Sequence, residues 1–152
     1  YGKKHHAEIE RLAAISDLAL LAFEDARKPL ARAMGSDKQW DRYWACITAS
    51  VFGKSAKPLV PDAKKLLSDE NLMVRARAAE FLGSIKALDP MPTLIGVLNE
   101  SKSTQEILLT FNMVVYLRDY KGYAFDLSEV KLKTKGGESS RRTDYLSGKG
   151  KL

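Results

Sequence analysis

One run of eighteen residues carries the pattern of the chain: Leu66-Leu67-Ser68-Asp69-Glu70-Asn71-Leu72-Met73-Val74-Arg75-Ala76-Arg77-Ala78-Ala79-Glu80-Phe81-Leu82-Gly83. An apolar pair is followed by a polar loop and then by apolar residues at helical spacing. The run therefore predicts the end of one helix, a short loop and a second helix. The predicted buried stripe of that second helix is Val74, Ala78, Phe81, Leu82 and Ile85.

The same pattern occurs 33 residues earlier. Arg42 lies three residues before the small pair Ala45-Cys46, just as Arg75 lies three residues before Ala78-Ala79. A more divergent third copy covers residues 94–117. A period of this length is typical of stacked helical repeats, in which each helix pair buries its apolar face against its neighbours. We expect each repeated arginine to reach carbonyl groups or an acid of the neighbouring repeat.

Three further helices follow from apolar spacing. The first is expected from about His6 to Phe23, with Ile9, Leu12 and Leu20 in its buried stripe. The other two predicted buried stripes are Trp40, Tyr43, Trp44, Ile47 and Val51, and Ile107, Phe111, Val114 and Val115.

The carboxyl-terminal part differs from the repeats. Val130, Leu132 and Thr134 alternate with lysines, which predicts a short strand or extended arm. The net charge is +6, and residues 131–152 hold seven Lys or Arg against two Asp or Glu, or +5. We therefore expect an all-α fold with two parts, a helical repeat domain over 1–125 and a basic extended arm over 126–152.

The sequence does not assemble a catalytic or metal site. Its histidines, His5 and His6, are adjacent near the amino terminus, whereas metal ligands usually converge from separated positions. Cys46 lies in an apolar helical stretch and is expected to be a small core residue. We predict no catalytic residue, no metal and no cofactor for this chain. The longest apolar run, from Leu18 to Phe23, is too short to span a bilayer.

Several side chains are candidates for an interaction surface. Trp40, Tyr43 and Trp44 could stack on a sugar, but their spacing favours the core, with Tyr43 as the one that shows a face. Aromatic residues near the end of the repeats either cover the last apolar face or dock another domain, and both readings stay open. Arg141 and Arg142 could bind an acidic polymer, but a folded nucleic-acid binder places its charge on a structured face, so nucleic acid is not expected. The candidate surface residues are Arg42, Tyr43, Arg75, Tyr120, Tyr123, Arg141 and Arg142.

The run from Leu66 to Gly83 resembles HEAT repeats of the short bacterial type, with Val-Arg, Ala-Ala and Leu-Gly in the family's order. This resemblance implies an α–α superhelix, or solenoid, built from about seven helices. Neither the ankyrin Thr-Pro-Leu-His signature nor the tetratricopeptide pattern is present.

A narrower resemblance rests on Asp41-Arg42-Tyr43-Trp44-Ala45 and on Arg118-Asp119-Tyr120-Lys121-Gly122-Tyr123. Both are similar to the helical C-terminal extension of some bacterial sulfatases. The catalytic signature of that family is Cys or Ser, any residue, Pro, any residue, Arg. Cys46 is followed by Ile47-Thr48-Ala49-Ser50, so no catalytic residue can be carried over.

The resemblance implies a non-catalytic C-terminal domain of a sulfatase, which packs on or orients the catalytic domain or positions a sulfated glycan. A start at Tyr1 suggests a piece of something longer, so the missing signal peptide says little about location. A sulfatase would be periplasmic or secreted, and another parent protein could be cytoplasmic. The alternative is a free-standing scaffold that binds a protein on the concave face of the solenoid.

Overall fold

A computed structural model of the chain describes residues 3–134 and 136–150. Throughout these residues the regular structure is helical, with eight α-helices, four short 3-10 segments and no strand. The all-α prediction is therefore confirmed.

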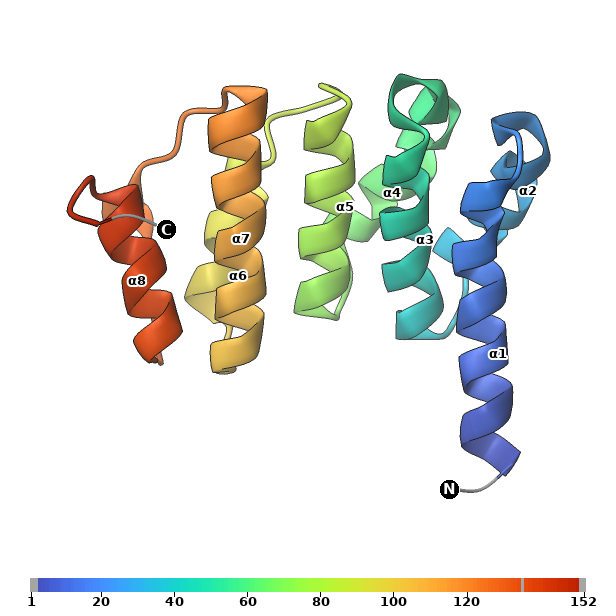
Figure 1. The fold of residues 1–152 in the computed structure, drawn as a ribbon, viewed down its shortest axis with the longest axis horizontal. Helices are drawn as coiled ribbons and strands as arrows, with labels where there is room; N and C mark the ends of the chain where they lie inside the picture. Colours follow the sequence, from blue (N-terminus) through green and yellow to red (C-terminus); the bar gives the residue numbers. More distant parts are fainter. Residues whose placement is uncertain (1–2, 135, 151–152) are drawn as a thin grey trace.

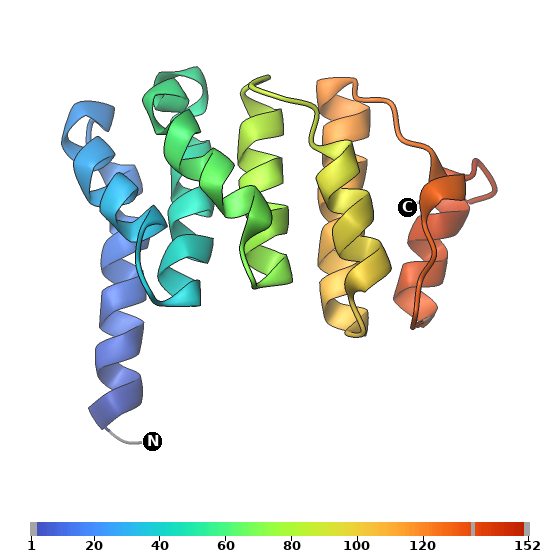
Figure 2. The same cartoon turned by 180° about the vertical axis from the view of Figure 1, so that it is seen from behind.

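The helices form two rows (Figures 1 and 2). The members of the first row run side by side and in the same direction, and α5 contacts both α3 and α7. The second row lies behind the first and runs back in the opposite direction. The first row holds α1 (Lys3–Asp17), α3 (Gln39–Val51), α5 (Leu72–Ser84), α7 (Thr104–Lys121) and α8 (Gly137–Leu146). The second holds α2 (Phe23–Met34), η2 (Gly53–Leu59), α4 (Val60–Lys65), η3 (Leu66–Ser68) and α6 (Met91–Glu100).

Local signals fix the helix ends. The Asn71 side chain accepts hydrogen bonds from the amides of Met73 and Val74 at 3.0 and 3.1 Å, and so caps α5. Ser103 caps α7 in the same way through the amide of Glu106. α7 ends where Gly122 adopts a left-handed conformation with φ of 73°, which glycine permits without a steric penalty.

The core lies between the two rows, and α5 crosses its middle. The predicted stripe of α5 is buried throughout, as is that of α7. Ala76, Ala78 and Ala79 are fully buried, and their small side chains let α5 approach its neighbours on several sides. Phe81 and Leu82 fill the space beside them.

The stripe predicted for α3 is wrong. Trp40 is 44% exposed and Val51 is 65% exposed, whereas Ala45, Cys46 and Ala49 are fully buried. α3 packs against α1, α2 and α5, so close helix contacts take its small residues and leave its bulky side chains outside. The prediction that Cys46 is a core residue is confirmed.

The first predicted helix is two elements instead of one. α1 ends at Asp17, η1 (Leu18–Leu20) follows, and Phe23 already belongs to α2. Leu20 is 84% exposed because it lies in the turn between them and not on a continuous stripe. Apolar spacing alone did not reveal this break.

The predicted extended arm over 126–152 is wrong for Gly137–Leu146, which form α8. The alternating residues 130–134 form neither helix nor strand, but Val130 and Leu132 pack on the core cluster of α6 and α7. α8 lacks a wide apolar stripe, so the sequence pattern missed it. Its start is fixed by the Ser139 hydroxyl, which accepts a hydrogen bond from the amide of Gly136 at 3.0 Å.

Gly83 is where α5 comes closest to the start of α6. A methyl group at this position would lie 2.6 Å from Cγ of Pro90. We expect Gly83→Ala to lower the free energy of unfolding by about 1–3 kcal/mol, since overpacking outweighs the gain in helix propensity. Urea unfolding followed by circular dichroism measures the change.

Gly96→Ala is the matched control, because the added methyl group meets nothing within 4 Å inside α6. It should raise stability by roughly 0.5–1 kcal/mol. Equal effects of the two substitutions would contradict the proposed close contact.

Candidate binding groove on the open face

The repeated arginines, Arg42 and Arg75, make hydrogen bonds that connect neighbouring helix pairs, as predicted. Arg42 donates to both carboxylate oxygens of Asp69, at 2.7 and 3.0 Å, and to the Ser36 carbonyl at 2.9 Å. Arg75 donates to the Asp69 carbonyl and to Glu100. These contacts connect α3 with the loop before α5, and α5 with the end of α6.

Burial separates the two arginines. Arg42 is 8% exposed and fully engaged, so its side chain is internal rather than presented to a partner. Burial would raise the pKa of Asp69, but hydrogen bonds from Arg42 and from the Asn71 amide outweigh it and lower that pKa. The Arg75–Glu100 pair is more exposed and is therefore screened by solvent.

The bulky side chains of α3 form a contiguous aromatic surface. The Tyr43 ring lies edge-on to Trp40 at 5.5 Å and to Trp44 at 6.0 Å between ring centroids. Tyr43 and Trp44 are half-buried. The sequence favoured the core for these three residues, and Trp40 in particular departs from that prediction.

Arg77 joins this aromatic surface to α5. Its guanidinium donates to Glu80 at 2.7 Å and to the Tyr43 hydroxyl at 2.9 Å, and its Cζ lies 5.1 Å from the Tyr43 ring centroid. Burial alone would lower the pKa of Arg77, but Glu80 and Tyr43 outweigh it and raise that pKa. The guanidinium stays charged and lies near the face of the ring.

α7 carries a second aromatic surface. Tyr116 and Tyr120 stack with ring centroids 6.0 Å apart, and Tyr120 is 79% exposed. The ammonium of Lys121 lies 5.7 Å from the Tyr116 centroid. The side chains of these three residues project from α7 on the side away from its buried stripe.

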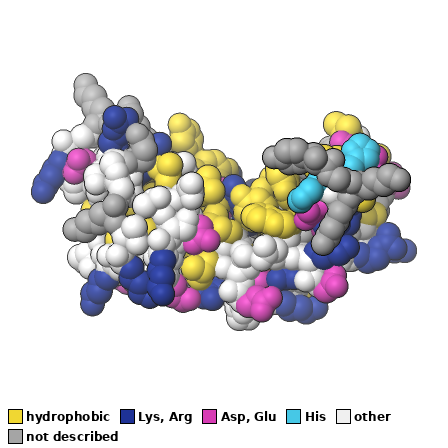
Figure 3. Space-filling model, turned by 90° about the horizontal axis from the view of Figure 1, so that it is seen from below, with side chains coloured by type: hydrophobic (Ala, Val, Ile, Leu, Met, Phe, Trp, Pro, Cys, Tyr) yellow, Lys and Arg dark blue, Asp and Glu magenta, His cyan; other side chains and the backbone are white. Residues whose placement is uncertain are grey.

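A groove of about 290 Å³ lies near the carboxyl ends of α3, α5 and α7. Tyr116 is the aromatic side chain among its lining residues, whereas Trp40 lines a separate pocket beside α1. In Figure 3 the molecule is hollowed on the side formed by the first row, and hydrophobic side chains gather in the hollow. We call this surface the aromatic groove. Its lining residues are Ile47, Ser50, Gly53, Arg77, Glu80, Ser84, Tyr116 and Lys121.

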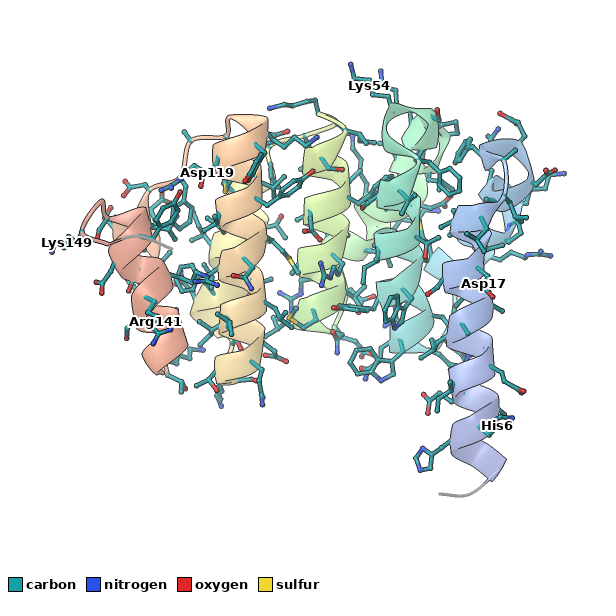
Figure 4. All side chains as sticks on the ribbon, in the orientation of Figure 1. His6, Asp17, Lys54, Asp119, Arg141 and Lys149 are labelled. Atoms are coloured by element: carbon teal, nitrogen blue, oxygen red, sulfur yellow. The ribbon has the colours of Figure 1, made fainter. Side chains whose placement is uncertain are left out.

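The remaining candidates lie elsewhere. The Tyr123 hydroxyl donates to the carbonyls of Gly83 and Leu88, so this side chain ties the end of α7 to the α5–α6 connection. Arg142 donates to Asn112 of α7 at 2.8 Å. Arg141 lies on α8, well away from the aromatic groove (Figure 4). Of the candidate residues, Tyr43 accepts a hydrogen bond from the groove residue Arg77, and Tyr120 stacks on the groove residue Tyr116, but neither lines the groove itself.

Two of the terminal aromatics cover the last apolar face, as the first reading expects, and docking of another domain stays a prediction. Tyr123 and Phe125 pack on the core cluster of α6 and α7, together with Val130 and Leu132 of the following segment. Tyr116 and Tyr120 instead stay open. The turn at Gly122 separates the covering residues from the exposed ones.

Arg77 and Glu80 are groove residues that the sequence did not single out. They lie three residues apart on an otherwise apolar, alanine-rich helix, which places both on one face. That spacing was the available signal. The 33-residue pattern contains Arg75, two residues earlier, but not Arg77.

The reactive side chains of the described residues do not converge. Cys46 is buried, and burial raises the pKa of its thiol to about 12. Within the described ranges, no three His, Cys, Asp or Glu side chains come together closely enough to hold a metal ion. No helix in the same part of the chain combines the length and apolarity needed to cross a membrane.

Comparison with known proteins yields no match to a family model, a curated protein or a solved structure.

The buried pair of Arg42 and Asp69 should dominate the ion pairs in stability. We expect Asp69→Asn to lower the free energy of unfolding at pH 7 by about 3 kcal/mol, because it leaves Arg42 buried without its counter-charge. The exposed control, Glu100→Gln, should cost less than about 1 kcal/mol. Urea titrations of both variants measure the difference.

The effect of Asp69→Asn should also depend on pH. The folded-state pKa of Asp69 is lowered, so its contribution is complete above the unfolded pKa of about 4 and is lost as pH falls through the folded value. The gap between wild type and variant should therefore narrow below about pH 4. A gap that is unchanged down to pH 2 would contradict the assignment.

Proposed function

We propose that this chain is a HEAT-like, right-handed helical solenoid that serves as the non-catalytic C-terminal domain of a sulfatase. It packs on the catalytic domain, or orients it, through the aromatic groove. The 33-residue repeat and the two rows of helices support the HEAT-like assignment. The similarity of residues 41–45 and 118–123 to sulfatase extensions supports the identity of the parent protein. A periplasmic or secreted location follows from that identity.

One observation carries the binding role: the stacked pair of Tyr116 and Tyr120 lies open beside an unfilled groove. Tyr116 lines the groove and is 37% exposed, and Tyr120, which stacks on it, is 79% exposed. Exposed aromatic residues gathered on one surface are typical of protein interfaces, where they supply most of the binding energy.

A free-standing scaffold is the second candidate, and the same groove favours it. The two proposals share the binding surface and differ in whether the partner is covalently joined. The full-length gene discriminates between them, since a sulfatase catalytic signature upstream of Tyr1 supports the first. A sulfated glycan is a further ligand for the groove, given Arg77 and Lys121 beside Tyr116.

The isolated chain should not hydrolyse sulfate esters. We expect no turnover of 4-nitrophenyl sulfate above the buffer rate at any pH from 5 to 9. The matched positive control is the full-length protein under the same conditions. Robust turnover by the purified chain of residues 1–152 would overturn its non-catalytic role.

Docking through the groove is tested in trans. The part of the parent protein that precedes Tyr1 is expressed separately and titrated with this chain by isothermal calorimetry. Tyr116→Ala and Tyr120→Ala should each weaken binding at least tenfold, because each removes one member of the aromatic pair at the groove. Leu20→Ala, at an exposed apolar residue outside the groove, should leave affinity unchanged. Loss of affinity only in the Leu20 variant would exclude docking through the groove.

A further inference from the structure

A second pocket, of about 480 Å³, lies between the amino half of α1 and the start of α3. On this side of the molecule α1 extends past the first turn of α3 (Figure 1). We call it the Trp40 pocket. Its lining residues are Ala7, Glu8, Arg11, Lys38, Gln39 and Trp40, and none of these six lines the aromatic groove. The two sites therefore lie at opposite ends of α3.

Trp40 gives this pocket an aromatic face that is held in place. The residue is 44% exposed although it lies next to two other aromatic residues of α3. The Tyr43 ring meets it at an interplanar angle of 83°, so at most one face of the indole contacts that ring. Tyr43 is fixed in turn by the hydrogen bond that Arg77 donates to its hydroxyl at 2.9 Å. A platform that is ordered before binding loses little conformational entropy when a ligand stacks on it.

Polar side chains surround this aromatic face, and Ala7 is the one other apolar residue in the lining. Arg11 is oriented by Asp41, which accepts from its Nε at 2.8 Å, and its terminal nitrogens make no hydrogen bond to the described residues. The side-chain oxygen of Gln39 accepts from Asn71 at 3.0 Å, which leaves the Gln39 amide nitrogen available as a donor. An apolar anchor of a protein partner would find little apolar surface here beyond the indole. The pocket instead suits a compact ligand that has an apolar face and a polar edge.

The charges around the pocket balance. Arg11 lies 2.8 Å from the carboxylate of Asp41 and 3.8 Å from that of Glu8, so one cation faces two acids. Lys38 supplies the second positive charge, and its ammonium forms no ion pair with the residues that the structure describes. A nucleic-acid base can also stack on an aromatic ring, but its phosphates require cations in excess of acids. Charge balance therefore favours an uncharged ligand that forms hydrogen bonds.

We propose that the Trp40 pocket binds a neutral pyranose unit of an oligosaccharide. A pyranose ring has apolar C–H faces and carries its hydroxyl groups around the edge. One face stacks on the indole of Trp40, and hydroxyl groups at the edge donate to the Glu8 carboxylate and accept from Lys38 and Gln39. The site is at the end of α3 away from the aromatic groove, so this inference goes beyond the proposed docking role and does not depend on it.

The test uses the intact chain of residues 1–152 and three neutral tetrasaccharides that differ in the orientation of their hydroxyl groups, namely cellotetraose, mannotetraose and β-1,4-galactotetraose. Isothermal calorimetry should show at least one of them binding with a Kd below about 1 mM. The chain contains two tryptophans, so Trp44→Phe leaves Trp40 as the single tryptophan. The same sugar should then change the fluorescence emission of Trp40 and protect it from quenching by acrylamide.

Matched variants locate the binding. Trp40→Ala should weaken it by about tenfold or more, and Trp40→Tyr, which keeps an aromatic face, should restore part of the loss. Lys38→Ala, at an exposed residue, should weaken it about threefold. Tyr116→Ala and Tyr120→Ala remove the aromatic pair at the groove and should leave sugar affinity unchanged. Circular dichroism confirms that each variant folds.

Four outcomes would overturn the inference. The first is the absence of binding by all three tetrasaccharides at about 5 mM. The second is an affinity that is the same in Trp40→Ala and in the wild type. The third is binding that Tyr116→Ala abolishes, which would place the sugar in the aromatic groove. The fourth is a heparin tetrasaccharide or a dodecamer of thymidylate that binds more tightly than every neutral sugar and depends on Trp40.

Discussion

Asp69 joins two consecutive helix pairs, and the register of the molecule depends on it. Its carboxylate accepts both hydrogen bonds from Arg42 of α3, and one of its oxygens also accepts from the amide of Asn71, whose side chain caps α5. Its carbonyl accepts from Arg75 of α5, within the same repeat. Asp69 therefore ties the loop before α5 to α3, beside the residue that caps α5. Because the pair is buried, the geometry is tightly defined.

The aromatic groove follows from how these helices approach one another. Close packing of α3 on its neighbours requires small residues at the contacts, and Ala45, Cys46 and Ala49 supply them. The aromatic residues of the same helix then have no room inside and lie on the open face. The close packing of α3 and the exposure of its aromatic side chains are thus two results of one distribution of side-chain sizes along the helix.

The sequence predicted the helical repeats because their signals are local and periodic. The stripes of α5 and α7, and the reach of Arg42 and Arg75, follow directly from spacing and from a repeated loop. The orientation of α3 was predicted wrongly. Hydrophobic spacing does not show whether a face of large apolar residues is buried or is displaced to the surface by a face of small residues that packs more closely. α8 was missed because it is held to α7 mainly by polar contacts, such as Arg142 with Asn112 and Tyr145 with Asp119. The groove joins residues from three helices, so periodicity within any one of them could not reveal it.

The burial of Cys46 makes this residue an internal reporter of the central packing. The Cys46 thiol is buried where α3 packs against its neighbours, and its raised pKa leaves almost no thiolate at neutral pH. An alkylating reagent can reach it only when α3 separates from its neighbours, so the rate of modification follows the population of opened molecules. Since the chain contains a single cysteine, a cysteine introduced on the open face could be labelled without interference from the core.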